Sequence, residues 1–112
     1  MLLIIESDPR TSHRPGEAIR IAAGVGSWKK VDIIIYLREA AVLALGEYAE
    51  DLVDEENYTR YLPILLNFDR PIYVQRGAPL LVKGKENPFR FEEIDDAQLA
   101  SLAAHSTYLL RF

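Results

Sequence analysis

Two polar side chains that could take part in chemistry follow directly after a short apolar segment late in the chain. Residues 72–74 (IYV) are typical of a buried strand, and Gln75 and Arg76 come immediately after them. In a parallel α/β sheet, ligands bind just past the carboxyl ends of the strands. Glutamine can donate and accept hydrogen bonds and arginine can bind an anion, but neither offers a nucleophile. The segment therefore predicts a pocket or an interface edge, and a simple turn at Gly77 is the alternative.

Four more polar residues are predicted at the same edge, because they too follow apolar segments. One pair comes after the first apolar run of the chain, and the other comes after residues 31–37 (VDIIIYL). The predicted pocket consists of Ser7, Asp8, Arg38, Glu39, Gln75 and Arg76. For Ser7 and Asp8 the competing interpretation is a turn before Pro9, and loop polarity of this kind favours the turn.

The composition of the chain excludes several classes of chemistry. Its 112 residues contain no cysteine, which rules out disulfides, thiolate metal sites and thiol nucleophiles within the chain. The two histidines, His13 and His105, have no carboxylate at ligand spacing, so no metal or cofactor site is predicted. An enzyme acting through Asp8, Arg38 or Glu39 is disfavoured, because their spacing assembles no nucleophile with a base and an oxyanion donor. No catalytic residue is predicted.

Charge and hydropathy bear on partners and location. The net charge is −4, from 17 acidic and 13 basic side chains, and this disfavours binding to nucleic acid. No apolar run is long enough to span a membrane. The first residues, MLLII, lead into Glu6 and Asp8 and not into the cleavage site of a signal peptide. We therefore expect a cytoplasmic protein that binds neither membranes nor nucleic acid.

The hydrophobic pattern predicts five strands that alternate with helices in one domain, residues 1–112. Strands are expected at residues 2–6, 31–37, 72–75, near 91 and at 107–112. Helices are expected to begin after Thr11 or Ser12, near Arg38 or Glu39, after Asp54 and after Asp95. Gly24 and Gly26 are expected to end the first helix, and Pro63 indicates a break or a late start in the third. The predicted fold is α/β, a three-layer αβα sandwich of flavodoxin-like type with a mainly parallel five-stranded sheet.

The start of the first predicted helix offers an alternative function. Backbone N–H groups at a helix N-terminus attract anions, and Arg10, Arg14 and Arg76 would add positive charge. A small-ligand or nucleotide-binding α/β module of unrelated role is therefore a second hypothesis. The sequence contains neither a GxGxxG nor a GxxxxGK[ST] pattern, so an ordinary capped helix is the favoured interpretation.

Three segments, taken in order, carry a resemblance to a known family. A helix-like segment, residues 17–26 (EAIRIAAGVG), leads directly into the strand-like residues 31–37. Residues 38–45 (REAAVLAL) follow, and residues 92–112 close the chain as a helix and a strand. In this order the chain resembles the DsrE/DsrF-like family of small sulfur-relay proteins, which includes the TusB, TusC and TusD type of subunits. The resemblance lies in hydrophobicity and segment length, and it covers most of the chain.

The resemblance implies a place where a reactive sulfur is missing. Thiol-bearing members of the family carry a cysteine just past the strand that matches residues 72–74, which corresponds to Gln75 or the next residue. A persulfide carrier needs a thiolate, and glutamine cannot replace it in any protonation state. The resemblance thus implies a DsrE-like domain that is not itself a persulfide carrier. It would act as a structural or binding subunit, with a cysteine-bearing sulfur-transfer protein as its partner.

The resemblance also implies an assembly, because family members of this type pack as trimers or hexamers. Aromatic side chains are favoured at the cores of protein interfaces. Tyr58, Tyr61 and Leu65, on one face of the third predicted helix, are the residues expected at a subunit contact. If the chain forms a homo- or hetero-oligomer, its mass measured by sedimentation should be well above the 12.7 kDa of one chain.

Overall fold

Five strands form one parallel sheet in the computed structural model, which describes residues 1–28, 32–45, 52–67, 71–78 and 91–112. The strands are β1 (Leu2–Ile5), β2 (Ile34–Leu37), β3 (Ile72–Gln75), β4 (Phe91–Ile94) and β5 (Leu109–Arg111). Their order across the sheet is β4-β3-β2-β1-β5, and every neighbouring pair is parallel. The predicted five-stranded, mainly parallel sheet is confirmed.

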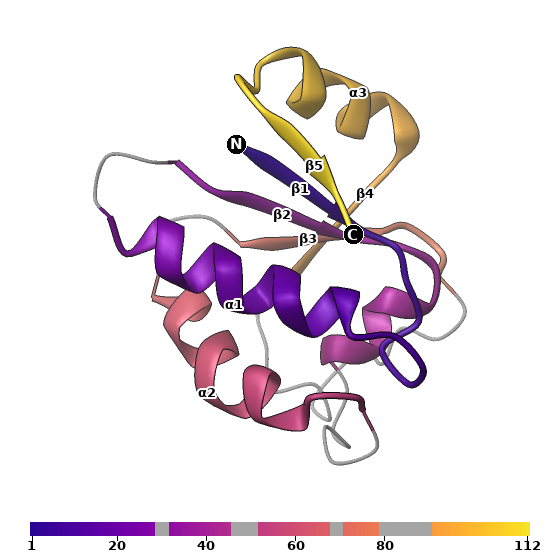
Figure 1. Cartoon of the computed structure of the whole chain (residues 1–112). Coiled ribbons are helices and arrows are strands. Elements are labelled where there is room, and N and C mark those ends of the chain that lie inside the picture. Colours follow the sequence, from indigo (N-terminus) through magenta and orange to yellow (C-terminus); the bar gives the residue numbers. More distant parts are fainter. Residues whose placement is uncertain (29–31, 46–51, 68–70, 79–90) are drawn as a thin grey trace.

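Helices cover both faces of this sheet (Figure 1). The helix α1 (Arg14–Gly26), the 3₁₀ helix η1 (Glu39–Leu45) and α2 (Glu55–Leu66) share the larger apolar core with one face of the sheet. The helix α3 (Asp96–Ala104) lies on the other face, where its two leucines pack against a smaller core. The predicted three-layer αβα sandwich is therefore confirmed. In the described parts of the chain, no helix is both long enough and apolar enough to cross a membrane.

The strands β1 and β2 are buried along their whole length, because helices cover both of their faces. Successive side chains of a strand point to opposite faces of the sheet. Leu3 and Ile5 accordingly belong to the larger core, whereas Leu2 and Ile4 belong to the smaller core beside α3. This double burial accounts for the uninterrupted apolar runs in the sequence and fixes the ends of the strands, where the polar residues begin.

Two local features differ from the predictions, whereas α1 ends at Gly26, the second of the two glycines predicted to stop it. Pro63 lies inside α2 without breaking it. The segment that begins at Glu39 is a 3₁₀ helix. Proline removes one backbone hydrogen bond from a helix, but in a folded protein the packing of the apolar face supplies most of the stability of a helix. The buried face of α2 therefore outweighs the local cost of Pro63.

The three predicted N-terminal caps have different outcomes. The N-cap of α1 is His13 and not Thr11 or Ser12, and its side chain makes no capping hydrogen bond. The Asp95 carboxylate accepts a hydrogen bond from the Gln98 N–H at 2.8 Å, and the Gln98 side chain accepts one from the Asp95 N–H at 2.9 Å. This reciprocal pair is a capping box, so the predicted cap of α3 is confirmed. Asp54 precedes α2, but its side chain makes no capping hydrogen bond and lies 2.7 Å from His13. A contact with another helix has replaced the cap that local sequence predicts.

Candidate functional site

The sheet edge past β1 and β2 is held by an ion pair between Glu6 and Arg38. The register pairs Ile5 with Leu37, which places the two residues that follow them side by side. Arg38 Nε donates to Glu6 Oε2 at 3.0 Å, and the Arg38 N–H donates to the Ile5 carbonyl at 3.0 Å. Both side chains are partly exposed, so water screens the pair and its contribution to stability is small. The pair nevertheless sets the position of the Arg38 guanidinium.

Gln75, the last residue of β3, uses its side chain to hold the start of η1. Its Oε1 accepts a hydrogen bond from the Glu39 N–H at 3.0 Å, although the two residues are 36 positions apart in the sequence. Glu39 has a φ of 54°, in the left-handed region, which costs a residue with a Cβ about 1 kcal/mol. The Gln75 amide oxygen thus satisfies a backbone donor at a strained position. This oxygen is committed to the turn between β2 and η1.

Arg76 and Gly77 lead away from β3 toward the end of β4. The Arg76 N–H donates to the Ile94 carbonyl at 3.0 Å, and the Arg76 guanidinium lies 3.6 Å from the Asp95 carboxylate. Both of these charged side chains are about half exposed. Gly77 has a φ of 77°, a conformation that glycine adopts without strain. The turn at Gly77 is therefore present, and an exposed charge pair lies beside it.

Ser7 and Asp8 lie in the loop after β1, and their hydrogen bonds shape that loop. The Asp8 carboxylate accepts a hydrogen bond from the Arg10 N–H at 2.9 Å and another from the Arg10 guanidinium at 2.8 Å. The side-chain bond from Arg10, followed by the backbone bond, lowers the pKa of Asp8 below its ordinary value. The Ser7 N–H donates to the Phe112 carbonyl at 3.2 Å. Asp8 is thus engaged within its own loop.

The structure brings three of the six predicted pocket residues together and gives the others separate partners. The three are Arg38, Glu39 and Gln75, whereas Ser7, Asp8 and Arg76 are bonded elsewhere. The predicted pocket omits Glu6 and Asp95, the two carboxylates that hold its arginines. Each of these carboxylates directly follows a strand, and that position in the sequence could have identified both as residues of the sheet edge.

The residues predicted at a subunit contact lie mostly in the interior of the chain. Tyr58 is 1% exposed and Leu65 is 2% exposed, and both belong to the larger apolar core. Tyr61 is partly buried against the same core. The pattern correctly identifies the apolar face of α2, but this face packs against the chain's own core. Tyr58 and Leu65 are therefore too buried to contact another subunit, and only Tyr61 keeps part of its side chain on the surface.

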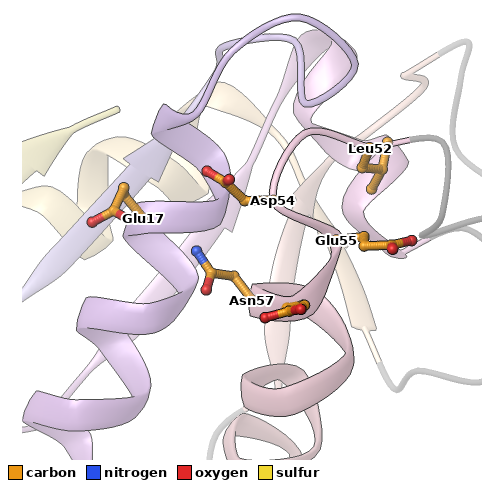
Figure 2. Close-up of a pocket in the computed structure, with 6 residues that line it drawn as sticks. Glu17, Leu52, Asp54, Glu55 and Asn57 are labelled. Atoms are coloured by element: carbon orange, nitrogen blue, oxygen red, sulfur yellow. The ribbon is translucent and has the colours of Figure 1, made fainter.

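A second polar feature lies where the first turns of α1 and α2 meet (Figure 2). This hollow of about 500 Å³ is lined by Glu17, Leu52, Asp54, Glu55, Glu56 and Asn57. Asp54 Oδ2 lies 2.7 Å from His13 Nδ1, a contact that the spacing of carboxylates along the sequence does not indicate. The two residues are 41 positions apart, and only the packing of the helices joins them. The described residues gather no group of three or more side chains that could hold a metal ion.

Gln75→Leu is expected to lower the free energy of unfolding by about 1 kcal/mol, the usual contribution of one hydrogen bond. Leucine keeps the approximate volume of glutamine but offers no acceptor to the Glu39 N–H. Gln75→Glu keeps an acceptor in the same place and should retain the stability of the parent chain near neutral pH. Urea denaturation followed by far-ultraviolet circular dichroism measures both. Equal stability of the two variants would show that the Gln75–Glu39 bond contributes nothing.

No family model matches the chain, and no curated protein is similar to it in sequence. Among solved structures, the crystal structure of the YchN protein from E. coli is similar, with a TM-score of 0.72 and 20% sequence identity. The similarity covers 99% of this chain and 97% of that one. It confirms the predicted fold class. The chain therefore shares its three-layer α/β fold with YchN over almost its whole length.

Proposed function

We propose that the chain is a non-catalytic DsrE/DsrF-like domain, a structural or binding subunit related to intracellular sulfur-relay proteins and not itself a persulfide carrier. The observation that carries this proposal is the bond from the Glu39 N–H to Gln75 Oε1. The sequence resemblance puts the family's cysteine at Gln75 or the next residue. In this chain the position holds an amide that stabilises a turn, and the chain has no thiol to take up sulfur.

The charges around Gln75 support a binding role over a catalytic one. Arg38 is paired with Glu6, and Arg76 is paired with Asp95. A catalytic site usually holds a group whose protonation is tuned for the reaction, with a nucleophile or base in reach. The edge instead offers a neutral amide and compensated charges, which can meet a complementary surface. Paired charges at the rim of an interface contribute to specificity and association rate more than to affinity.

A thiol-bearing DsrE/DsrF-like protein encoded in the same genome is the partner to test. We expect the purified chain to form a complex of fixed stoichiometry with it, measured by light scattering after size exclusion and by titration calorimetry. Arg76→Glu should weaken this complex about 10-fold, because it reverses an exposed charge beside Gln75. Arg60→Glu, an equal charge reversal on the exposed side of α2, is the matched control and should leave the affinity unchanged.

Two results would count against the proposal. One is a chain that stays apart from every thiol-bearing candidate. The other is a complex that Arg76→Glu and Arg60→Glu weaken to the same extent, because the contact would then not lie at the carboxyl edge of the sheet.

The alternative, a module that binds a nucleotide or another small anion, has less support. Arg10 is bonded to Asp8, Arg14 donates to the Arg111 carbonyl at 3.2 Å, and Arg76 lies beside Asp95. Each arginine offered for an anion thus already has an acceptor. A thermal-shift screen against nucleotides and inorganic phosphate tests this alternative, since a ligand that binds only the folded state raises its stability.

A further inference from the structure

The strand β5 forms one edge of the sheet and leaves apolar side chains in solvent (Figure 1). Tyr108 is 66% exposed, and Leu109 and Leu110 are 42% and 41% exposed. Successive side chains of a strand point to opposite faces of the sheet, so the two leucines lie on different faces. Neither of them belongs to either apolar core. Both faces of this edge strand therefore present apolar surface to water.

The strand at the opposite edge, β4, is protected in a way that β5 is not. It carries Glu92 and Glu93, and its isoleucine, Ile94, is only 2% exposed. Charged side chains and proline on an edge strand discourage the addition of a further strand. The segment Tyr108–Leu110 contains neither a charged residue nor a proline. The side chains of β5 thus favour the addition of a strand that those of β4 discourage.

The outer side of β5 also offers backbone groups for pairing. The Tyr108 carbonyl accepts a hydrogen bond from β1 at 2.8 Å, and the Phe112 N–H donates one to β1 at 2.9 Å. Backbone groups of successive strand residues point in alternate directions, so those of Leu109 and Arg111 point away from β1. The Arg14 guanidinium donates to the Arg111 carbonyl at 3.2 Å. No described residue bonds to the N–H and C=O of Leu109 or to the N–H of Arg111.

Two positive charges lie at the carboxyl end of this edge. Arg111 is exposed, and Arg14 reaches it through a bond to a carbonyl, which carries no negative charge. In the described parts of the chain, no carboxylate lies within ion-pair distance of either arginine. An acidic group is therefore the complementary one at this end of β5.

We propose that the β5 edge, residues 108–111, binds an extended segment of another protein, which adds a strand to the sheet. The segment pairs with the free backbone groups, covers the two leucines with apolar side chains and places a carboxylate beside the two arginines. In strand addition of this kind, main-chain hydrogen bonds give affinity and alternate side chains give specificity. A second β5 edge does not fit, because residues 108–111 (YLLR) include no acidic side chain.

This inference is independent of the proposed function. The β5 edge is separated from β3, which holds Gln75, by β1 and β2. The segment that it binds needs no thiol. Failure of one proposal therefore leaves the other standing.

Heteronuclear NMR of the isotope-labelled chain tests the β5 edge. The probe is an end-blocked peptide in which valine and threonine alternate, with aspartates at both ends, and the control peptide has lysines in their place. We expect the aspartate peptide to shift the amide signals of Leu109 and Arg111 and to slow their hydrogen exchange. At low salt it should bind about 10-fold more tightly than the lysine peptide.

Leu109→Pro removes one outward N–H from the β5 edge. Proline is tolerated on an edge strand where the missing N–H faces solvent, so the bonds from β5 to β1 should remain. The variant should bind the aspartate peptide about 10-fold or more weakly than the parent chain does. Leu109→Ala keeps the N–H, is the matched control and should lose less affinity. Circular dichroism and the amide signals of β1 check that both variants are folded.

Arg111→Glu gives a second test that leaves the backbone groups in place. This variant should bind the lysine peptide more tightly than the aspartate peptide, which reverses the preference of the parent chain. Arg60→Glu, the same charge reversal at an exposed position on α2, should keep the parent preference.

Three results would overturn the proposal. The first is an aspartate peptide that leaves the signals of Leu109 and Arg111 unchanged at millimolar concentration. The second is a folded Leu109→Pro variant that binds the peptide as tightly as Leu109→Ala does. The third is a shift of the same signals with the concentration of the chain alone, because a second copy would then occupy the edge.

Discussion

Tyr58→Phe is expected to raise the free energy of unfolding by about 1–2 kcal/mol, although it removes a polar group from the core. Tyr58 is 1% exposed, and the described residues offer its hydroxyl no hydrogen-bond partner. Folding therefore strips this hydroxyl of water without compensation, whereas phenylalanine fills the same space at no such cost. Tyr58→Ala should instead lower the free energy of unfolding by about 3–5 kcal/mol, because it leaves a cavity between α2 and its neighbours.

The same hydroxyl should make the chain sensitive to high pH. Burial, with a smaller effect from the Asp54 carboxylate, raises the pKa of Tyr58 well above its ordinary value. As the pH rises past about 10, the unfolded chain therefore loses this proton while the folded chain still holds it. The contribution of the protonated Tyr58 hydroxyl to the free energy of unfolding is fully present below that pH. Above it, the free energy of unfolding falls by up to about 1.4 kcal/mol for each pH unit. Burial also raises the pKa of Tyr36, which should add a loss of the same sign.

Urea denaturation of the parent chain and of Tyr58→Phe, between about pH 8 and pH 11, separates the two tyrosines. The Tyr58→Phe variant should lose less stability over this pH range than the parent chain. Of the loss caused by the two buried tyrosines, only the part due to Tyr36 should remain. Tyr61→Phe, on the same helix but partly exposed, is the control and should follow the parent chain. A Tyr58→Phe variant less stable than the parent at neutral pH would mean that the hydroxyl has a bound water or another partner.

Gly16→Leu should destabilise the fold by about 1–3 kcal/mol, the usual cost of overpacking a close contact. Gly16 is buried on α1 where α2 begins. A Cβ there would lie 3.4 Å from Asn57 Nδ2 and 3.5 Å from Asp54 Cβ, which leaves room for a methyl group but not for a leucine side chain. The larger residue would push the start of α2 away from α1 and disturb the pair between His13 and Asp54.

Gly24→Leu is the matched control in the same helix, measured at a protein concentration where sedimentation shows only monomer. Its Cβ meets nothing within 4 Å, so the variant should gain up to about 1 kcal/mol from helix propensity. Gly16→Ala should be close to neutral or slightly stabilising. Similar losses for Gly16→Leu and Gly24→Leu in urea denaturation would contradict the assigned role of Gly16 as the close contact between α1 and α2.

Much of the fold could be predicted because it depends on local pattern. The uninterrupted apolar runs at β1 and β2 indicate strands buried on both faces, and the structure covers both faces with helices. The strand β3 has its predicted bounds, Ile72–Gln75, and Asp95 is the N-cap of α3 as predicted. The helix α1 ends at Gly26, the second of the two glycines predicted to stop it, whereas Gly24 lies inside the helix because a helix interior tolerates one glycine at a cost of about 1 kcal/mol.

Only part of the candidate site could be predicted, because the sequence shows where the strands end but not which distant residues the fold brings to them. The carboxyl ends of parallel strands share one edge, so the sequence could place Arg38, Glu39 and Gln75 there. It could not assign their partners, because Glu6 and Arg38 meet through sheet register, and Gln75 meets Glu39 across 36 positions. Tyr58 and Tyr61 fit the same helical pattern, yet only the packing of α2 decides which is buried to 1%.

The sequence by itself determined the order of the elements, the parallel sheet and the lack of any thiol, because these depend on composition and on periodicity along the chain. Only the tertiary structure decided that Gln75 holds the turn at Glu39, that Asp54 meets His13, and that a Cβ would be tightly contacted at Gly16 but not at Gly24. Each of these depends on how closely two separate elements approach. That distance is set by the packing of the whole core and is not written in any local segment.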